Sequence, residues 1–154
     1  MVIYDTASVN ITFQEQDSLI LIRWLHQPDM VMMADAYLNG LQFVCKHPNT
    51  LYFCTDQSVI GPLDRELENW LLHDFYPSVY RCLEREIYAA VVFSDAHFKA
   101  IVTHYQATTP LPQHFIHFNY FACLQEALQW LSDVKKGQEI AARAPSADLF
   151  RTSY

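Results

Sequence analysis

Residues 87–93 read Ile-Tyr-Ala-Ala-Val-Val-Phe, and this short run is almost entirely apolar. A run of this length without alternation of apolar and polar residues is typical of a strand with both faces covered. Ser94 and Asp95 follow it, and either side chain can cap the helix that we expect from Ala96 to about Tyr105. A buried strand that leads into a helix is the building unit of a parallel α/β sheet, so we expect Ile87–Phe93 at the centre of the sheet.

The same succession of apolar runs and helical spacing continues on both sides of this strand. Residues 11–14 alternate apolar with polar side chains, and a polar turn separates them from the apolar run of residues 19–25, which predicts an opening antiparallel hairpin. Two more strands are expected at Leu51–Cys54 and Phe115–Phe118. Apolar residues at helical spacing predict helices from Pro28 and Asp29 to His47, from Leu63 to Leu83, and from Leu124 to about Lys135.

This order of elements, ββαβαβαβα, predicts the α/β class. We expect a mixed, mostly parallel sheet of about five strands with about four helices. The length of 154 residues fits one domain, and a hydrophobic content of 51% is enough for a core. The domain is expected to span residues 1–136. The helical periodicity is lost from Gly137 onward, so we expect residues 137–154 to form a loosely attached C-terminal tail.

Two residues interrupt the helical patterns. Gly40 lowers the stability of the first helix by about 1 kcal/mol relative to alanine, and close packing of the helix on the sheet would explain it. Pro77 has no amide proton and clashes with the preceding turn. We therefore expect the helix of residues 63–83 to kink or break near His73–Tyr76.

The charge of the chain excludes some classes of partner. Ten Lys and Arg against seventeen Asp and Glu give a formal net charge of −7, which repels phosphate backbones and anionic lipid surfaces. We therefore expect no nucleic-acid partner. The longest apolar run, residues 87–93, is too short to cross a bilayer, and no basic leader precedes an apolar segment, so we expect no membrane insertion and a cytoplasmic location. Four dispersed cysteines form no C-x-x-C pair and are expected to be buried thiols: Cys45, Cys54, Cys82 and Cys123.

Two packing motifs carry a resemblance to a known family. The segment from Phe121 through Glu126-Ala127 to Trp130-Leu131 resembles an "FxxxxEAxxWL" ending, and Trp70-Leu71 with Phe75 and Pro77 resembles a "WL…F.P" helix. Both are found in the SpoIIAA-like branch of the STAS domain superfamily, which the chain resembles over about residues 10–135. The resemblance implies a bacterial regulatory domain without enzymatic activity, acting through surface loops and forming a homodimer.

The loop after the third strand departs from the family pattern. Partner-switching members carry Asp-x-Ser, then an Asp eight residues after the first and a phosphorylated serine directly after it. Asp56, Ser58 and Asp64 match this spacing, but Arg65 stands at the serine position, so the serine-controlled switch is absent. The four residues either form a partner-docking loop at the carboxyl end of a strand or simply cap and solvate the next helix.

No group of residues meets the spacing of a catalytic, metal or cofactor site. His114 and His117 point to opposite faces of a strand, and His97 and His104 lie two turns apart without a third ligand. Only three glycines are present, which excludes dinucleotide and phosphate-binding loops. We therefore expect no metal, no cofactor and no enzymatic activity; the enzymatic alternative is a cysteine, Cys54 or Cys82, activated by a histidine.

These observations predict a cytoplasmic regulatory or protein-interaction domain whose partner is another protein or a second copy. The alternative is a protein that binds a small apolar ligand or lipid, since Met30, Met32 and Met33 could line an adaptable pocket. Aromatic residues near the strands are numerous enough to cover both faces of a sheet. If the helices lie mainly on one face, something else must cover the other.

Overall fold

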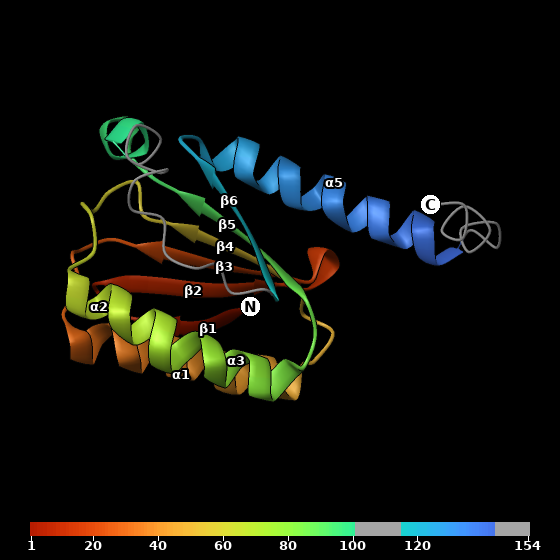
Figure 1. The fold of residues 1–154 in the computed structure, drawn as a ribbon, viewed down its shortest axis with the longest axis horizontal. Coiled ribbons are helices and arrows are strands. Elements are labelled where there is room, and N and C mark those ends of the chain that lie inside the picture. The colour runs from red at the N-terminus through yellow and green to blue at the C-terminus, as the bar shows by residue number, and fades with distance from the viewer. Residues whose placement is uncertain (101–114, 144–154) are drawn as a thin grey trace.

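The computed structural model describes residues 1–100 and 115–143, and these form one six-stranded mixed sheet (Figure 1). The strands lie side by side in the order in which they occur along the chain. The first three are antiparallel neighbours and the remaining pairs are parallel. Their bounds are β1 Val2–Asp5, β2 Val9–Gln14, β3 Leu19–Trp24, β4 Tyr52–Asp56, β5 Ile87–Val92 and β6 Ile116–Phe121. The predicted α/β class with a mostly parallel sheet is confirmed.

The run at residues 87–93 and the opening hairpin fold as predicted. β5 pairs with β4 on one side and with β6 on the other, so it is an interior strand. β2 and β3 form the antiparallel hairpin, joined by the 3₁₀ turn η1, Glu15–Asp17. The expected number of strands was too low by one, because β1 also pairs with β2, at the edge of the sheet. A four-residue edge strand with a bulge is too short to show a period of two.

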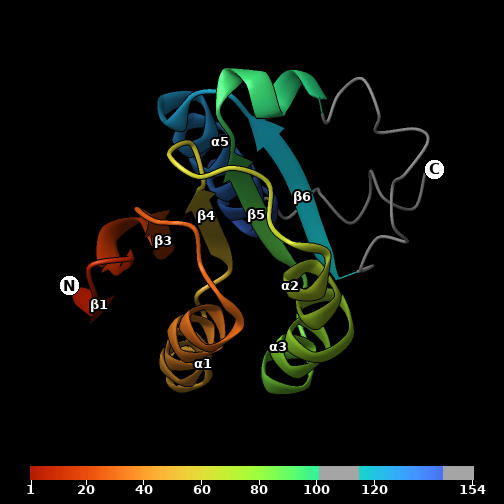
Figure 2. The same ribbon diagram turned by 90° about the vertical axis from the view of Figure 1, so that its left-hand side faces the viewer.

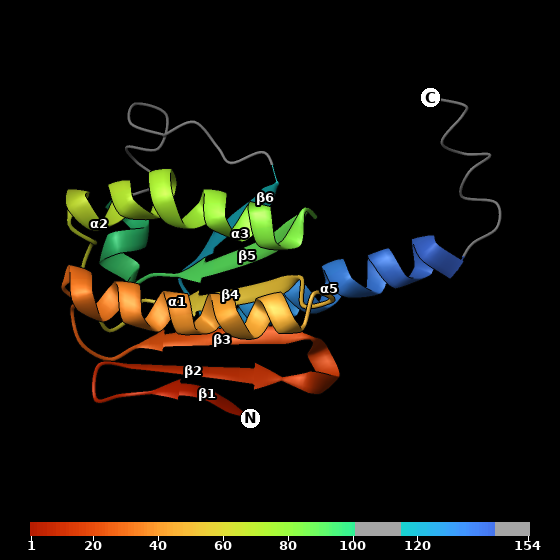
Figure 3. The ribbon, with the colours of Figure 1, turned by 90° about the horizontal axis from the view of Figure 1, so that it is seen from below.

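The helices lie on both faces of the sheet, as Figure 2 and Figure 3 show. α1, Met30–Lys46, begins at Asp29, whose carboxylate accepts the Met32 N–H at 2.8 Å. The second predicted helix consists of α2, Arg65–Trp70, a π-helical turn η2, Leu71–Phe75, and α3, Tyr76–Leu83. The π turn ends just before Pro77, which confirms the expected interruption at this proline.

α1 and α2–α3 share one face, and α5, Leu124–Arg143, packs on the other against β4, β5 and β6. Because the strands carry enough aromatic residues for both faces of the sheet, we expected a second element to cover the face opposite α1. That element is α5. The two apolar cores reflect this arrangement: Trp24, Met33 and Ile20 belong to the core under α1 and α2–α3, while Cys54 and Ala127 belong to the core under α5.

Two of the predicted ends were wrong. α5 continues through Gly137 to Arg143, so the predicted boundary at residue 136 falls inside a helix; residues 144–154 lie outside the described residues. Gln138 stabilises this extension, because its side-chain amide links the hydroxyls of Tyr52 and Tyr88. β6 also runs three residues beyond Phe118. The helix after β5 covers residues 95–100, with the Ser94 hydroxyl accepting the His97 N–H, and its predicted end at Tyr105 lies outside the described residues.

The expectation of four buried thiols is correct only for Cys54. Cys45 near the end of α1 and Cys82 near the end of α3 form a disulfide, with 5.8 Å between their Cα atoms. Cys123 is free and exposed. The spacing of the cysteines in the sequence does not predict this pairing. It depends on the ends of α1 and α3 lying side by side in the folded chain. Among the described residues, no helix is long and apolar enough to span a membrane.

Candidate functional site

A cavity of about 110 Å³ lies between α1 and α2–α3, above the sheet. In Figure 2 the two helical segments stand side by side over β4 and β5. Tyr37 and Leu41 of α1 form one wall, and Phe75 of η2 with Val79 of α3 forms the other. The residues that form the floor come from four neighbouring strands: Ile20, Ile22, Phe53, Ala89 and Phe118. The cavity is therefore built from the segments that also form the larger of the two cores.

The floor of this cavity is not fully covered. Phe53, Ala89 and Phe118 occupy one rung of the sheet, with Ala89 between the two aromatic residues. All three side chains are only half-buried, although β4 and β5 are interior strands. The neighbouring Ile87 and Ile116, nearer the amino ends of β5 and β6, are 4% and 5% exposed. The small side chain of Ala89 between two large rings thus leaves a hollow that the helices do not fill.

Polar groups line the cavity in addition to its apolar walls. The Trp24 indole N–H donates to the Tyr37 hydroxyl at 3.3 Å. Burial raises the pKa of Tyr37, and hydrogen bonds to Trp24 and Thr55 act in the opposite direction. Burial also raises the pKa of Tyr76, so both phenols are neutral, although the Tyr37 hydroxyl is already hydrogen-bonded to Trp24 and Thr55. Gln57, a buried residue just after β4, lines the cavity at the carboxyl end of the strands, where open α/β sheets bind ligands.

The opposite end lies beside the Cys45–Cys82 disulfide. Val44, the neighbour of Cys45, lines the cavity, and the bridge holds the ends of α1 and α3 together there. Gly40 also lines the cavity, and a Cβ atom built on it would be 3.9 Å from Ile11 Cδ1, an ordinary van der Waals distance. The packing of Gly40 on the sheet is therefore ordinary and not unusually close, and a Cβ atom at this position would meet Ile11 without a clash.

The predicted partner loop divides into two parts. Asp56 is buried, and its Oδ1 atom accepts the Ser58 N–H at 3.0 Å and the Ser58 hydroxyl at 2.6 Å. Its Oδ2 atom lies 3.8 Å from Nε of Arg23. Asp64 is the N-cap residue of α2 but makes no capping bond with its side chain, and Arg65 is exposed beside it. Within the described residues, no hydrogen bond or ion pair joins Asp56 and Ser58 to Asp64 and Arg65.

The other predicted candidates do not form a reactive centre. Burial, then the nearby Asp56 carboxylate, raises the pKa of Cys54 to about 12, so this thiol is protonated at neutral pH. Cys82 is in the disulfide. His97 packs on Phe93, and His117 stacks on Tyr88. His104 and His114 lie outside the described residues, and within those that are described no three His, Cys, Asp or Glu side chains come together as metal ligands.

None of the three methionines of the predicted cluster is among the residues that line the cavity. Met33 is fully buried and Met30 packs against the same core, whereas Met32 is partly exposed. No motif in the sequence pointed to the polar residues of the cavity, which are Tyr37, Thr55, Gln57 and Tyr76. Thr55 gave the clearest signal, since it is a polar residue that directly follows the apolar residues of β4.

Comparison of the chain with protein-family models, with curated proteins and with solved structures gives no match. The resemblance to the STAS superfamily therefore stays a prediction from the two packing motifs.

Proposed function

We propose that the protein binds a small, neutral, largely apolar molecule in the cavity between α1 and α2–α3. The observation that carries this proposal is the incompletely buried floor of Phe53, Ala89 and Phe118 on neighbouring strands of the sheet. Apolar side chains at such positions normally gain stability from complete burial, about 25 cal/mol for each Å² removed from water. A bound apolar molecule would complete that burial.

The volume limits the size of the ligand. An empty apolar cavity of roughly 150 Å³ is large enough to take up benzene, and the cavity here is about 110 Å³. Because this space is smaller than the benchmark, a single ring or a short branched chain is the largest ligand expected, and even a ring requires the lining side chains to adjust; a lipid chain requires α1 and α3 to separate.

The polar groups favour a ligand that carries one hydroxyl or carbonyl group. Tyr37, Thr55 and Tyr76 are neutral polar groups, and among the described residues no Lys or Arg lines the cavity to balance an anion. One neutral hydrogen bond contributes about 1 kcal/mol, or about fivefold in affinity. We therefore expect phenol to bind about five times more tightly than benzene.

Thermal unfolding with and without phenol tests the proposal. A ligand that binds only the folded chain raises the melting temperature in a concentration-dependent way. Ala89→Leu fills the hollow between Phe53 and Phe118 and should abolish the effect. Ala122→Leu, at an exposed position, is the matched control and should keep it. If millimolar phenol leaves the wild-type melting temperature unchanged, or if Ala89→Leu responds like the wild type, the proposal is wrong.

A second candidate function is the one that the resemblance implies, a regulatory domain that binds a second copy through the loop after β4. Val59 favours it, because this apolar side chain is 70% exposed in that loop. Sedimentation velocity of the wild type and of Val59→Asp tests this candidate. A wild-type dimer that Val59→Asp converts to a monomer supports it, and a wild type that stays monomeric at high micromolar concentration contradicts it.

A further inference from the structure

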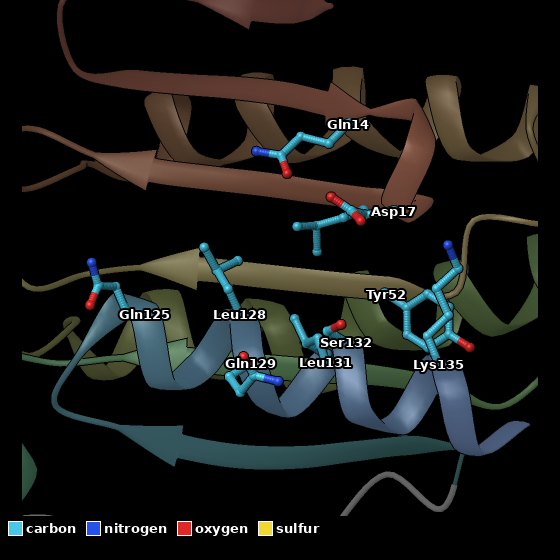
Figure 4. Close-up of a pocket in the computed structure, with 10 residues that line it drawn as sticks. Gln14, Asp17, Tyr52, Gln125, Leu128, Gln129, Leu131, Ser132 and Lys135 are labelled. Carbon is cyan, nitrogen blue, oxygen red and sulfur yellow. The ribbon is translucent and has the colours of Figure 1, made fainter.

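A second and larger hollow lies on the opposite face of the sheet, beside α5. Its volume is about 330 Å³, within the range of small-molecule pockets. Figure 4 shows the residues that line it along one side of α5 and at the turn between β2 and β3. α5 packs on β4, β5 and β6 and leaves this space next to β3. We call it the α5 groove; it is separate from the cavity between α1 and α2–α3.

The α5 groove combines an apolar base with amide side chains. Leu19 and Leu131 are buried, and Leu128 is half-buried beside them. Three carboxamides line the same groove: Gln14 at the end of β2, and Gln125 and Gln129 on successive turns of α5. Each carboxamide carries both donors and an acceptor, which is the hydrogen-bonding pattern of a peptide bond; Gln129 already uses one N–H on Asp133 Oδ1 at 2.9 Å and keeps its carbonyl oxygen and second N–H for a ligand.

The charges that line the groove balance each other. Among the described residues that line it, Lys135 is the single cation and Asp17 the single anion. The Lys135 ammonium group already donates to the Gln16 carbonyl at 2.8 Å and lies 3.9 Å from a Glu139 carboxylate oxygen. These contacts tie α5 to the turn between β2 and β3. A ligand with a net charge therefore gains little electrostatic attraction from the lining residues, so the groove favours a neutral ligand.

Hydrogen bonds from the strands hold α5, which forms one wall of the α5 groove, in place. The Tyr52 hydroxyl donates to Gln138 Oε1, and Gln138 Nε2 donates to the Tyr88 hydroxyl at 2.8 Å. These bonds connect α5 to β4 and β5, and the Lys135 contact connects it to η1. A wall fixed at both sides forms the groove before any ligand arrives, which lowers the entropic cost of binding.

We propose that the α5 groove binds a neutral, peptide-like molecule: an aliphatic side chain carried on amide groups. The leucines receive the aliphatic group, and the carboxamides of Gln14, Gln125 and Gln129 exchange hydrogen bonds with the amides of the ligand. The proposal does not depend on the function proposed for the cavity between α1 and α2–α3, because the two sites share no residue.

Two-dimensional NMR of the full chain with N-acetyl-leucinamide as the probe tests this assignment. We expect the side-chain amide signals of Gln14, Gln125 and Gln129 to shift together at millimolar probe. N-acetylglycinamide lacks the aliphatic group and 4-methylpentanoate is an anion without an amide, so each should bind at least fivefold more weakly. The signals of Ala89 and Val79, in the other cavity, should not move.

Ser132→Tyr places a large side chain in the groove from a half-buried position and should weaken binding at least tenfold. Lys136→Tyr, at an exposed position outside the groove lining, is the matched control and should bind as the wild type does. Gln129→Ala is a milder second variant, for the case that Ser132→Tyr disturbs the spectrum of the whole protein. The proposal is overturned if the probe causes no shifts at 20 mM or shifts only residues elsewhere, or if Gln129→Ala and a folded Ser132→Tyr bind normally.

Discussion

Loss of the Cys45–Cys82 disulfide should destabilise the protein strongly. The two cysteines are 37 residues apart in the sequence. A cross-link of that span removes about 13 cal/mol/K of entropy from the unfolded chain, which corresponds to about 4 kcal/mol at 25 °C. We therefore expect the free energy of unfolding of the double variant Cys45→Ser/Cys82→Ser to be lower than that of the wild type by as much as about 4 kcal/mol. In the folded state, the variant also frees the ends of α1 and α3 beside the cavity between these helices.

Urea unfolding of the wild type, the double variant and Cys123→Ser measures this difference. Cys123→Ser is the matched control, because that cysteine is free and exposed, and it should unfold as the wild type does. Dithiothreitol should destabilise the wild type and leave the double variant unchanged. The reasoning is refuted if the double variant lies within about 1 kcal/mol of the wild type, or if thiol titration of the unfolded, unreduced protein counts four free thiols. Disulfides persist mainly in oxidising compartments, so the same titration bears on the predicted cytoplasmic location.

Three further predictions follow from single residues. Gly40→Ala should raise the free energy of unfolding by up to about 1 kcal/mol in a urea titration, because alanine favours the helix and its Cβ meets no clash; a loss of stability would show that the position is tightly packed. Cys54 should resist iodoacetamide in the folded protein at pH 7, since its pKa is raised to about 12, and rapid labelling in a mass spectrum would contradict its burial. Burial lowers the pKa of His97, so the imidazole of the unfolded chain takes up a proton more readily than that of the folded chain. The free energy of unfolding should therefore fall as the pH drops below about 6.5. His97→Gln should make the free energy of unfolding, measured by chemical denaturation, less sensitive to pH in that range.

The elements that follow from local chemistry could be predicted from the sequence. Asp29 caps α1 and Pro77 follows the π turn, because a cap and a missing amide proton act within one helical turn. The interior position of β5 followed from its lack of polar residues. Gly137 gave the wrong end for α5, because contacts made by Gln138 with two strands outweigh the low helix propensity of one glycine.

The sites depend on contacts between distant segments, and the sequence alone gave little sign of them. Asp56 and Ser58 lie two positions apart in one local turn, so their proximity follows from spacing. The hollow above Ala89 arises only when β4, β5 and β6 pair in register and two helices stand over them. The α5 groove likewise needs a helix late in the chain beside the first hairpin. Neither arrangement leaves a motif of fixed spacing.

Intermolecular NOE spectroscopy of the protein with phenol tests the central claim most directly, since it locates the ligand without any variant. We predict NOEs from the phenol ring protons to the methyl groups of Ala89, Val79 and Leu41, which line the cavity between α1 and α2–α3. NOEs only to Leu128 and Leu131 of the α5 groove, or no NOEs at saturating phenol, would contradict the account.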